Sequence, residues 1–467
     1  MKEHISRLYP FFKHFHDFKW RLAFKAVLTG AAAGLLAIIY RLTTEKGTEF
    51  AAHLYGITRQ HPFWIIAWVL AALAVGLLIA YMIKKEPMAS GGGVPQVEGI
   101  VRYGLKMRWL VVIVVRYVAG ILGSLFGLSF GPEGPSVQLG AAINQGISTR
   151  FSKTKLEEKY LETAGAAAGL SAAFSAPLTG TLFALEEIHR NFSPLVFLSA
   201  IAASLSSDFI SKFFFGLKPV VYFQSIPQLP LQQYFWLLPL GVFAGLAGVL
   251  TNKGMLFTQT LFNRFPTKMR SFISLLIAIV CGLFLPQVLG GGHDLVNIVG
   301  MQYTLHMLVL LFIVKLVFSC TSIGSGTPGG IFMPIIAISA LSGSLFASLA
   351  GHIGLASSLT PVIIICAMAG GLTACVKAPV TSIVLVIEMT SSFLHILPVA
   401  ICTFIALFLS DLLHTAPIYE AFLNRYIHKN GYTTTCDKCG EIIEQVVEYG
   451  SKVVNKHIKE ITWPKGA

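Results

Sequence analysis

Residues 131–135 read Gly-Pro-Glu-Gly-Pro, and they interrupt one of the most apolar stretches of the chain. The preceding residues 111–130 contain one charge, Arg116, and the following residues 136–148 contain none. A carboxylate at membrane depth is costly, so Glu133 is a candidate functional residue. The glycines and prolines break the helix and free backbone N–H groups beside the acid. The pattern predicts a site that holds a negative charge inside a bilayer.

The composition is that of a membrane protein. Of 467 residues, 54% are hydrophobic and 12% are charged, whereas a soluble domain has about 25% charged residues, and the mean hydropathy is +0.70. Residues 63–82 carry no charge and are long enough to cross a hydrocarbon core. The sequence predicts an all-α polytopic protein with tilted and broken helices. Further apolar runs lie at about 26–40, 109–130, 193–206, 234–251, 272–288, 303–320, 331–350, 358–376 and 392–410.

The net charge of +13 belongs mainly to the two ends of the chain, residues 2–25 and 425–465. We expect the protein in a cell inner membrane. By the positive-inside rule, both of its termini should lie in the cytoplasm. These bases flank apolar runs and form no separate domain, so anionic lipid headgroups explain them better than nucleic acid does. Residues 1–25 also lack the cleavage site of a signal peptide.

Five of the seven cysteines lie in apolar runs and are predicted to be packed thiols. Cys436 and Cys439 form an isolated C-x-x-C in the tail. A zinc site there would need two more ligands, for which His428 and His457 are candidates, but the spacing fits no standard site. The default prediction is a pair of reduced thiols, and the sequence suggests neither a metal nor a cofactor.

The chain contains an internal repeat. Residues 169–179 and 371–381 share Gly, Leu, Ala, Ala, Pro and Thr at a constant offset of 202, which Glu186 and Glu388 continue. At an offset of 199, Gly-x-x-x-Pro recurs from Gly131 to Gly330, and Arg116 matches Lys315. We therefore predict two transmembrane repeats, 26–215 and 216–413, between a cytoplasmic N-terminal segment, 1–25, and a tail, 414–467. Such repeats often have inverted topology and bind their substrate where they meet.

The two Gly-x-x-x-Pro segments suggest the charge of the ligand. Each one lies where a glycine-rich stretch enters an apolar helix, around Gly134 and around Gly330. A helix N-terminus carries about half a positive charge and unpaired N–H donors, and glycine lets a ligand approach them. Two such ends that face each other form a pocket for a small anion, whereas a cation would need carbonyls or carboxylates.

These segments resemble the three filter motifs of the CLC family of chloride channels and transporters. The resemblance covers about residues 25–425 and includes five separated motifs: residues 90–95, 131–135, 324–334, 185–187 and 417–419. It implies a CLC-type fold of two inverted repeats and a homodimer in which each subunit has its own anion pathway. The implied activity is exchange of chloride, or a similar small monovalent anion, for protons.

The resemblance also implies roles for single residues. Glu133 resembles the external gating glutamate, and Glu187 resembles the internal proton-transfer glutamate of the exchangers. Tyr419 is similar to the tyrosine whose hydroxyl faces the central anion, and the amides of Ile331 and Phe332 are similar to the central donors. An ionised Glu133 could occupy the anion site and block it, whereas a protonated Glu133 would move aside. Proton and anion would thus compete for one place.

Two departures from the family pattern affect the choice of anion. Gly92 stands where most chloride-selective members have a serine, so one hydroxyl donor is lost and nitrate becomes an alternative to chloride. Pro132 replaces the usual arginine before Glu133, which removes a positive charge and an N–H. We therefore expect a weaker outer anion site.

Other charged residues have simpler interpretations. Glu186 and Glu187 could both be cytoplasmic surface acids beside Arg190. For Glu98 and Glu388 we expect structural partners, such as Arg116, Lys315 or the end of a neighbouring helix. These two bases are themselves expected to snorkel or to form ion pairs.

Two other functions compete with exchange. A passive anion channel of the same fold is the nearest alternative, and Glu187 argues against it. An intramembrane hydrolase is more distant: residues 127–131 fit G-x-S-x-G around Ser129, but that motif requires a strand–turn–helix and partner residues.

Overall fold

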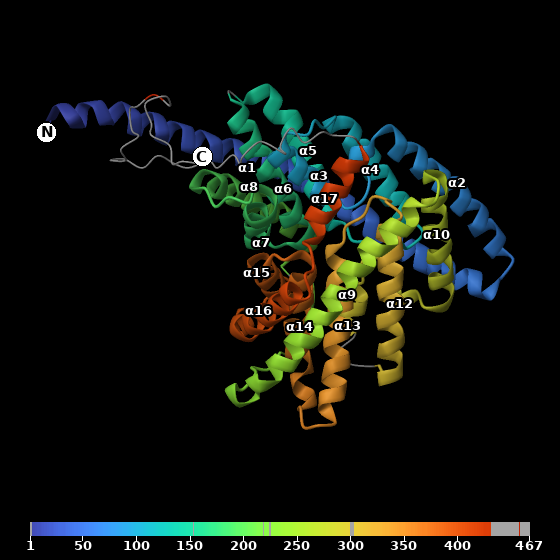
Figure 1. Ribbon diagram of the computed structural model, residues 1–467. Coiled ribbons are helices and arrows are strands. Elements are labelled where there is room, and N and C mark those ends of the chain that lie inside the picture. Colours follow the sequence, from blue (N-terminus) through green and yellow to red (C-terminus); the bar gives the residue numbers. More distant parts are fainter. Residues whose placement is uncertain are drawn as a thin grey trace.

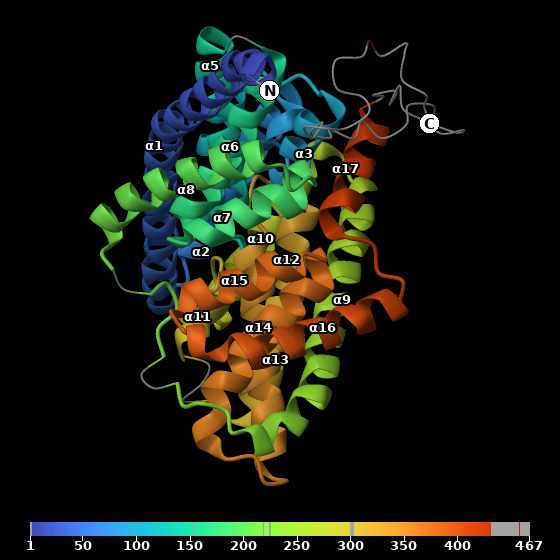
Figure 2. The same cartoon turned by 90° about the vertical axis from the view of Figure 1, so that its left-hand side faces the viewer.

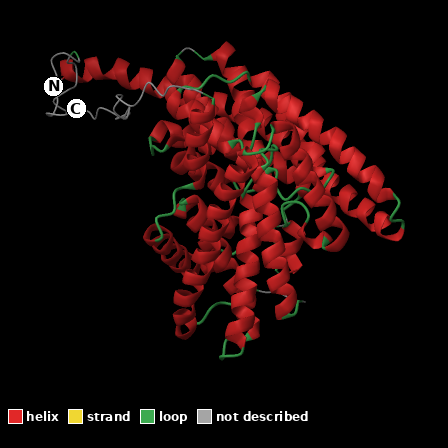
Figure 3. Ribbon diagram, turned by 45° about the vertical axis from the view of Figure 1, so that its right-hand side comes forward, coloured by secondary structure: helices red, strands yellow, loops and turns green. Residues whose placement is uncertain are grey.

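The structure is a computed structural model that describes residues 2–430 except 153, 218, 224–225 and 299–302, together with His457; side chains are described from residue 19 onward. Within this part the regular secondary structure is entirely helical, apart from one isolated β-bridge. The predicted all-α architecture is confirmed, and Figure 3 shows loops that meet between the helices near the middle of the molecule.

The helices of the first half are α1 (Lys2–Gln60), α2 (Trp64–Lys85), α3 (Val94–Tyr103), α4 (Trp109–Ser124), α5 (Glu133–Phe151), α6 (Lys155–Phe174), α7 (Pro177–Phe183) and α8 (Pro194–Phe215). Those of the second half are α9 (Leu237–Asn263), α10 (Thr267–Phe284), α11 (His293–Ile298), α12 (Leu305–Gly324), α13 (Phe332–Gly351), α14 (Thr360–Val376), α15 (Pro379–Thr390), α16 (Ile396–Leu412) and α17 (Ile418–Lys429). A π-helical turn, η2 (Ala184–His189), continues α7. Short 3₁₀ turns are η1 (Pro87–Ala89), η3 (Leu231–Trp236), η4 (Pro286–Val288), η5 (Ser357–Leu359) and η6 (Phe393–His395).

Nine helices in the described part are long and apolar enough to cross a membrane. The apolar run 109–130 is not a single helix, because α4 ends at Ser124. Beyond it, Gly127 has a positive φ of 71° and the chain turns back, with the Leu128 N–H donating to the Gly123 carbonyl at 3.3 Å. This turn delivers residues 131–135 to the interior, where surrounding helices can shield a non-helical backbone from lipid.

The helices surround a buried centre. Nearly every residue of α13 and α14 is buried, whereas outer helices expose large apolar side chains, such as Phe213 of α8 at 86% and Phe408 of α16 at 71%. Exposed apolar surface of this kind is expected where lipid or another protein covers it. In Figures 1 and 2 most of the first half, blue to green, lies above most of the second half, yellow to red.

Backbone contacts repeat at the offset of 199 residues. The Gly91 N–H donates to the Gly326 carbonyl at 3.0 Å, and the Gly290 N–H donates to the Gly127 carbonyl at 3.0 Å. Gly290 and Gly326 lie 199 residues after Gly91 and Gly127, so the two hydrogen bonds join equivalent pairs of residues. In the first bond the donor belongs to the first half of the chain, and in the second bond it belongs to the second half. This reciprocity is what a two-fold relation between the predicted repeats produces.

Four of the cysteines in apolar segments are buried and Cys281 is partly buried, and all five are free thiols, as predicted. Cys436 and Cys439 lie outside the described residues. In the part of the chain that the structure describes, no group of His, Cys, Asp and Glu side chains is arranged to hold a metal ion.

Candidate anion and proton site

The two glycine-rich breaks meet at the centre of the molecule. Gly131 and Gly330 form an antiparallel bridge, with N–H to O distances of 3.0 Å from Gly131 and 2.8 Å from Gly330. The helix α5 begins two residues after Gly131, at Glu133, and α13 begins two residues after Gly330, at Phe332. The predicted meeting of the segments 131–135 and 330–334 is confirmed, and it brings two helix N-termini to one buried spot.

Backbone contacts at this junction leave no room for larger side chains. A Cβ atom on Gly134 would collide with the Gly92 carbonyl oxygen and would lie 3.1 Å from the Gly330 Cα. A Cβ on Gly330 would lie 2.8 Å from the Gly134 nitrogen. Glycine at these positions therefore allows three chain segments to approach one another closely. Gly92, Gly134 and Gly330, all predicted to surround the anion, are neighbours.

Glu133 lies at the junction and is completely buried. Neither oxygen of its carboxyl group accepts a hydrogen bond of ordinary geometry from the described residues, although the backbone N–H groups of Glu133 and Met333 lie close to it. A buried carboxylate without full hydrogen bonding is expensive. Its protonation, or its displacement by another anion, would relieve that cost, so the arrangement suits a group that changes state.

Aromatic side chains pack beside the start of α13. The ring of Phe332 lies 5.8 Å from the ring of Tyr419 and 5.4 Å from that of Phe183, centroid to centroid. Tyr419 and Ile331 are each 1% exposed, and the Tyr419 hydroxyl has no hydrogen-bond partner in the described part of the chain. This hydroxyl is therefore a buried donor that is available to a ligand.

Two cavities approach the junction. One, of about 580 Å³, reaches Ser90–Gly92 and Gly326, and its charged lining is basic. The other, of about 550 Å³, reaches Gly131 and Pro132 and is also lined by the Leu289–Gly292 segment, the equivalent of Ser90–Gly93 at an offset of 199. The two cavities thus approach the junction along equivalent segments of the two halves. The basic lining of the first consists of Arg270, Arg425, His428 and Lys429.

Glu187 lies apart from the junction, on the π-helical turn η2. The residue is 5% exposed, and its Oε2 atom has no hydrogen-bond partner among the described residues. Arg190, Glu98 and Glu420 are within electrostatic range of its carboxyl group. The phenol of Tyr419 is in turn within range of both Glu187 and Glu133. The interpretation of Glu187 as an exposed surface acid is wrong, because the turn directs it inward.

Glu186 and Glu388 each accept hydrogen bonds from the opposite half of the chain. Glu388 accepts hydrogen bonds from the Thr179 N–H at 2.7 Å and the Thr179 hydroxyl at 2.6 Å, at the start of α7. Glu186 accepts from the Thr381 N–H at 2.8 Å and the Thr381 hydroxyl at 2.7 Å, at the start of α15. Each carboxylate caps the first turn of a helix in the opposite half. The expectation for Glu388 is confirmed, and Glu186, which is half-buried, is a helix cap and not a free surface acid.

The buried bases bind backbone carbonyls. Arg116 and Lys315 are both 0% exposed. Arg116 donates to the Gly91 carbonyl at 2.9 Å, and Lys315 donates to the equivalent Gly290 carbonyl at 2.7 Å. The expected snorkelling or ion pairing is wrong, because non-helical loops at membrane depth leave carbonyls that need donors. Glu98 pairs instead with Arg102, at 2.7 Å, and with Arg190, at 3.4 Å.

The comparisons with known proteins agree with this geometry. Residues 75–411 match the family described as voltage gated chloride channel. The chain belongs to this family, the CLC family. It is 32% identical to the H(+)/Cl(-) exchange transporters ClcA of Citrobacter koseri and of Vibrio campbellii, in each case across 86% of this chain and 89% of the relative.

Solved CLC structures share the fold. A slow cyanobacterial Cl-/H+ antiporter is 28% identical and superimposes with a TM-score of 0.83, covering 88% of this chain and 99% of that one. A CLC-type fluoride/proton antiporter superimposes with a TM-score of 0.68 at 23% identity, covering 85% and 96% of the two chains. The second likeness supports the CLC fold alone.

The hydrolase alternative has no support in this CLC fold. The Ser129 hydroxyl shares a hydrogen bond of 2.8 Å with the hydroxyl of Ser319, and the Ser129 N–H donates to the Ser322 hydroxyl. The segment around it is a turn and not a strand–turn–helix. Neither a histidine nor a carboxylate is bonded to Ser129 in the described part, so the serine lacks the base that a nucleophile needs.

One residue beside the site was not predicted. Arg41 lines the cavity that reaches Pro132 and is within electrostatic range of Glu133. Arg41 directly follows the apolar run 26–40, so in the sequence it resembles a charged residue at the end of a membrane span. Only the structure shows that Arg41 lies inside the long helix α1 and not at the end of a span.

Proposed function

We propose that this protein is a secondary active exchanger that moves chloride, or a similar small monovalent anion, in one direction and protons in the other. The observation that carries the proposal is the completely buried Glu133 at the junction of the two glycine-rich breaks, which one cavity approaches at Gly92 and the other at Pro132. A titratable carboxyl group between two aqueous spaces can exchange protons and can also be replaced by an anion. The ClcA relatives, which are named as H(+)/Cl(-) exchange transporters, support this function.

The mechanism follows from the two charge states of Glu133. As a carboxylate it is itself an anion and is attracted to the N-terminal ends of α5 and α13. It then occupies the place that chloride would take and closes the path. As a neutral acid it loses that attraction and can move away, which admits the anion. Because one place accepts either the carboxylate or the transported anion, anion movement is coupled to protonation.

The residues around that place supply the surroundings of the anion. In this proposal the amides of Ile331 and Phe332 and the Tyr419 hydroxyl donate to it, and Gly92, Gly134 and Gly330 keep the backbone open to it. Glu187 carries protons between Glu133 and the side of the membrane nearer α17. The Tyr419 phenol, within electrostatic range of both acids, supports a connection between them.

The proposal also includes a setting for the protein. It is a homodimer in a cell inner membrane with both termini cytoplasmic, so the cavity lined by Arg425 and Lys429 of α17 faces the cytoplasm. The basic lining of that cavity supports an anion as the ion that enters there. Nitrate is an alternative to chloride, because Gly92 offers no side-chain hydroxyl.

Simultaneous flux measurements test the function. Proteoliposomes loaded with chloride and diluted into low chloride should take up protons against a proton gradient. The Glu133→Gln variant cannot ionise, so it should pass chloride without moving protons. A passive channel would move no protons uphill in the wild type, and proton pumping retained in the variant would contradict the role of Glu133. Repeating the assay with nitrate identifies the preferred anion.

A further inference from the structure

The cavity that reaches Pro132 combines several acids with one strong base. Glu45, Glu49 and Asp294 line it, and Arg41 is the one lysine or arginine among its described lining residues. Pro132 contributes neither a side-chain charge nor an N–H donor. An anion in this cavity would therefore meet net repulsion unless Arg41 offsets it.

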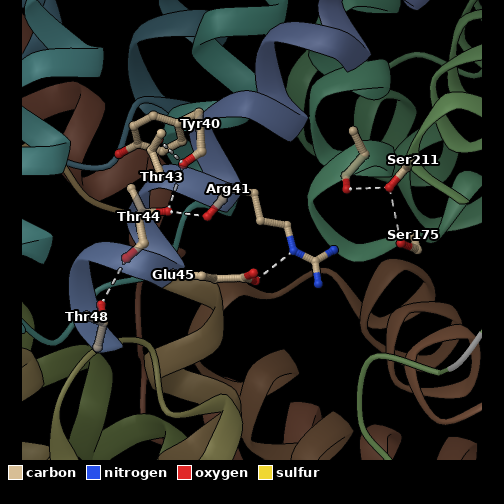
Figure 4. Close-up of polar contacts among 9 residues, drawn as sticks. Tyr40, Arg41, Thr43, Thr44, Glu45, Thr48, Ser175 and Ser211 are labelled. Carbon is tan, nitrogen blue, oxygen red and sulfur yellow. Dashed lines mark hydrogen bonds and ion pairs between the residues drawn. The ribbon is translucent and has the colours of Figure 1, made fainter. Parts of the chain in front are cut away.

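Contacts fix the Arg41 side chain but leave one of its N–H donor groups unpaired. The residue is 8% exposed, its Nε atom donates to the Glu45 carboxylate at 2.8 Å, and its guanidinium lies 4.0 Å over the ring of Phe215. Its Nη1 atom is buried and has no hydrogen-bond partner among the described residues. In Figure 4 the terminal nitrogens of Arg41 extend beyond the contact with Glu45. An unpaired guanidinium N–H in a buried place is costly unless a ligand uses it.

The position of Arg41 relates it to the gating residue. Its charge acts on the Glu133 carboxyl group, as does the opposite charge of Glu45. His293 lines the same cavity and is within electrostatic range of Arg41. Its Nε2 atom also lacks a hydrogen-bond partner in the described part. Arg41 thus lines the cavity and is also within electrostatic range of Glu133 at the buried junction.

We propose that Arg41 is an outer anion ligand, whose guanidinium binds the transported monovalent anion in this cavity before it reaches the place occupied by Glu133. A charge-assisted hydrogen bond from a guanidinium is among the stronger contacts available to a small anion. Glu45 orients the guanidinium and competes for it. The inference rests on the proposed transport function and adds a residue to the anion pathway on the side of Pro132.

Three variants of α1 test this inference. Arg41→Gln should weaken the apparent affinity for chloride in exchange assays roughly tenfold, as expected when one charge-assisted hydrogen bond is lost. Glu45→Gln should strengthen it, because the competing charge is gone. Lys46→Gln removes the same charge from an exposed residue of the same helix that does not line the cavity, and it should change nothing. Arg41→Lys should restore part of the affinity.

The same substitutions in a Glu133→Gln background separate direct from indirect action. If Arg41 binds the anion, Arg41→Gln still weakens chloride affinity in the uncoupled protein. An effect that disappears there would mean that Arg41 acts only through Glu133, and the inference would be overturned. Equal chloride affinities of Arg41→Gln and Lys46→Gln would also overturn the inference. If Arg41→Gln fails to fold, the test is Glu45→Gln, and a chloride affinity equal to that of the wild type would overturn the inference. Wild-type protein without any anion flux would instead contradict the proposed function.

Discussion

Gly92 is a glycine whose side-chain position is open. A Cβ atom there would have its nearest neighbour, the Cδ of Pro95, at 4.0 Å, and its φ is not in the left-handed region. The structure therefore accommodates a serine at this position without strain. Because its carbonyl contacts Gly134 at the junction, a hydroxyl added at Gly92 would lie beside the proposed anion place.

We predict that Gly92→Ser raises the preference for chloride over nitrate. One added hydroxyl donor should stabilise the smaller ion by about 1 kcal/mol, which corresponds to a change of several-fold in the ratio of apparent affinities. Competition between the two anions in proteoliposomes measures this ratio. Gly56→Ser is the matched control, since a Cβ at Gly56 meets nothing within 4 Å. An equal ratio in the wild type and Gly92→Ser would remove Gly92 from the selectivity site.

The buried bases show where reasoning from single residues fails. Arg116 and Lys315 could be recognised as a repeated pair from their spacing, but their partners could not. Those partners are the carbonyls of Gly91 and Gly290, which side-chain identity does not reveal. Arg41 was missed for a related reason: its burial and its unpaired Nη1 depend on how α1 packs, not on its neighbours in sequence.

At the scale of elements, the exchange of caps between α7 and α15 joins the two halves of the chain. Each helix begins with a proline, which leaves the following N–H groups as the donors that need acceptors. Those acceptors are the carboxylates of Glu388 and Glu186, and each comes from the opposite half. A helix cap therefore acts here as a tie between repeats.

We predict that Glu388→Ala lowers the free energy of unfolding by about 1–2 kcal/mol, because the first turn of α7 loses its cap. Glu186→Ala should have a similar effect on α15, since the geometry is reciprocal. The unfolding temperature of purified protein in detergent measures both changes. Glu49→Ala, at an exposed position that caps no helix, serves as the control and should leave the unfolding temperature unchanged. Variants indistinguishable from this control would show that the ties carry no stability.

The repeat and the junction were predictable at this scale, and the caps were not. Two Gly-x-x-x-Pro segments in apolar surroundings can satisfy their backbone groups only inside the protein. Because the segments are equivalent parts of two repeats, they were expected at the interface of the repeats, where Gly131 and Gly330 meet. The equivalence of Glu186 and Glu388 was also visible in the sequence. Which helix each one caps depends on how the halves cross, and periodicity contains no information about that.

At the scale of the whole molecule, Glu133 and Glu187 lie in different places and have different proposed roles. Neither acid is among the lining residues of the two cavities, but Glu133 directly follows Gly131 and Pro132, which line one of them, whereas Glu187 lies on η2. It belongs instead to a group of charges around Arg190, which pairs with Glu420 at 3.1 Å and Glu98 at 3.4 Å. A proton that leaves Glu133 toward Glu187 would therefore follow a path that the anion does not use. Separate paths that meet at one residue are what an exchanger needs.

This separation predicts the behaviour of Glu187→Gln. The amide is close in size to the carboxyl group but cannot release a proton, so the variant should lose proton movement while anion flux persists. Parallel recordings of pH and chloride from the same proteoliposomes would reveal both effects. Glu186→Gln is the matched control, because the adjacent carboxylate is bound to the first turn of α15, and its substitution should leave proton movement coupled to anion flux. Normal coupling in Glu187→Gln would require another proton path, and joint loss of both fluxes would place Glu187 on the anion path as well.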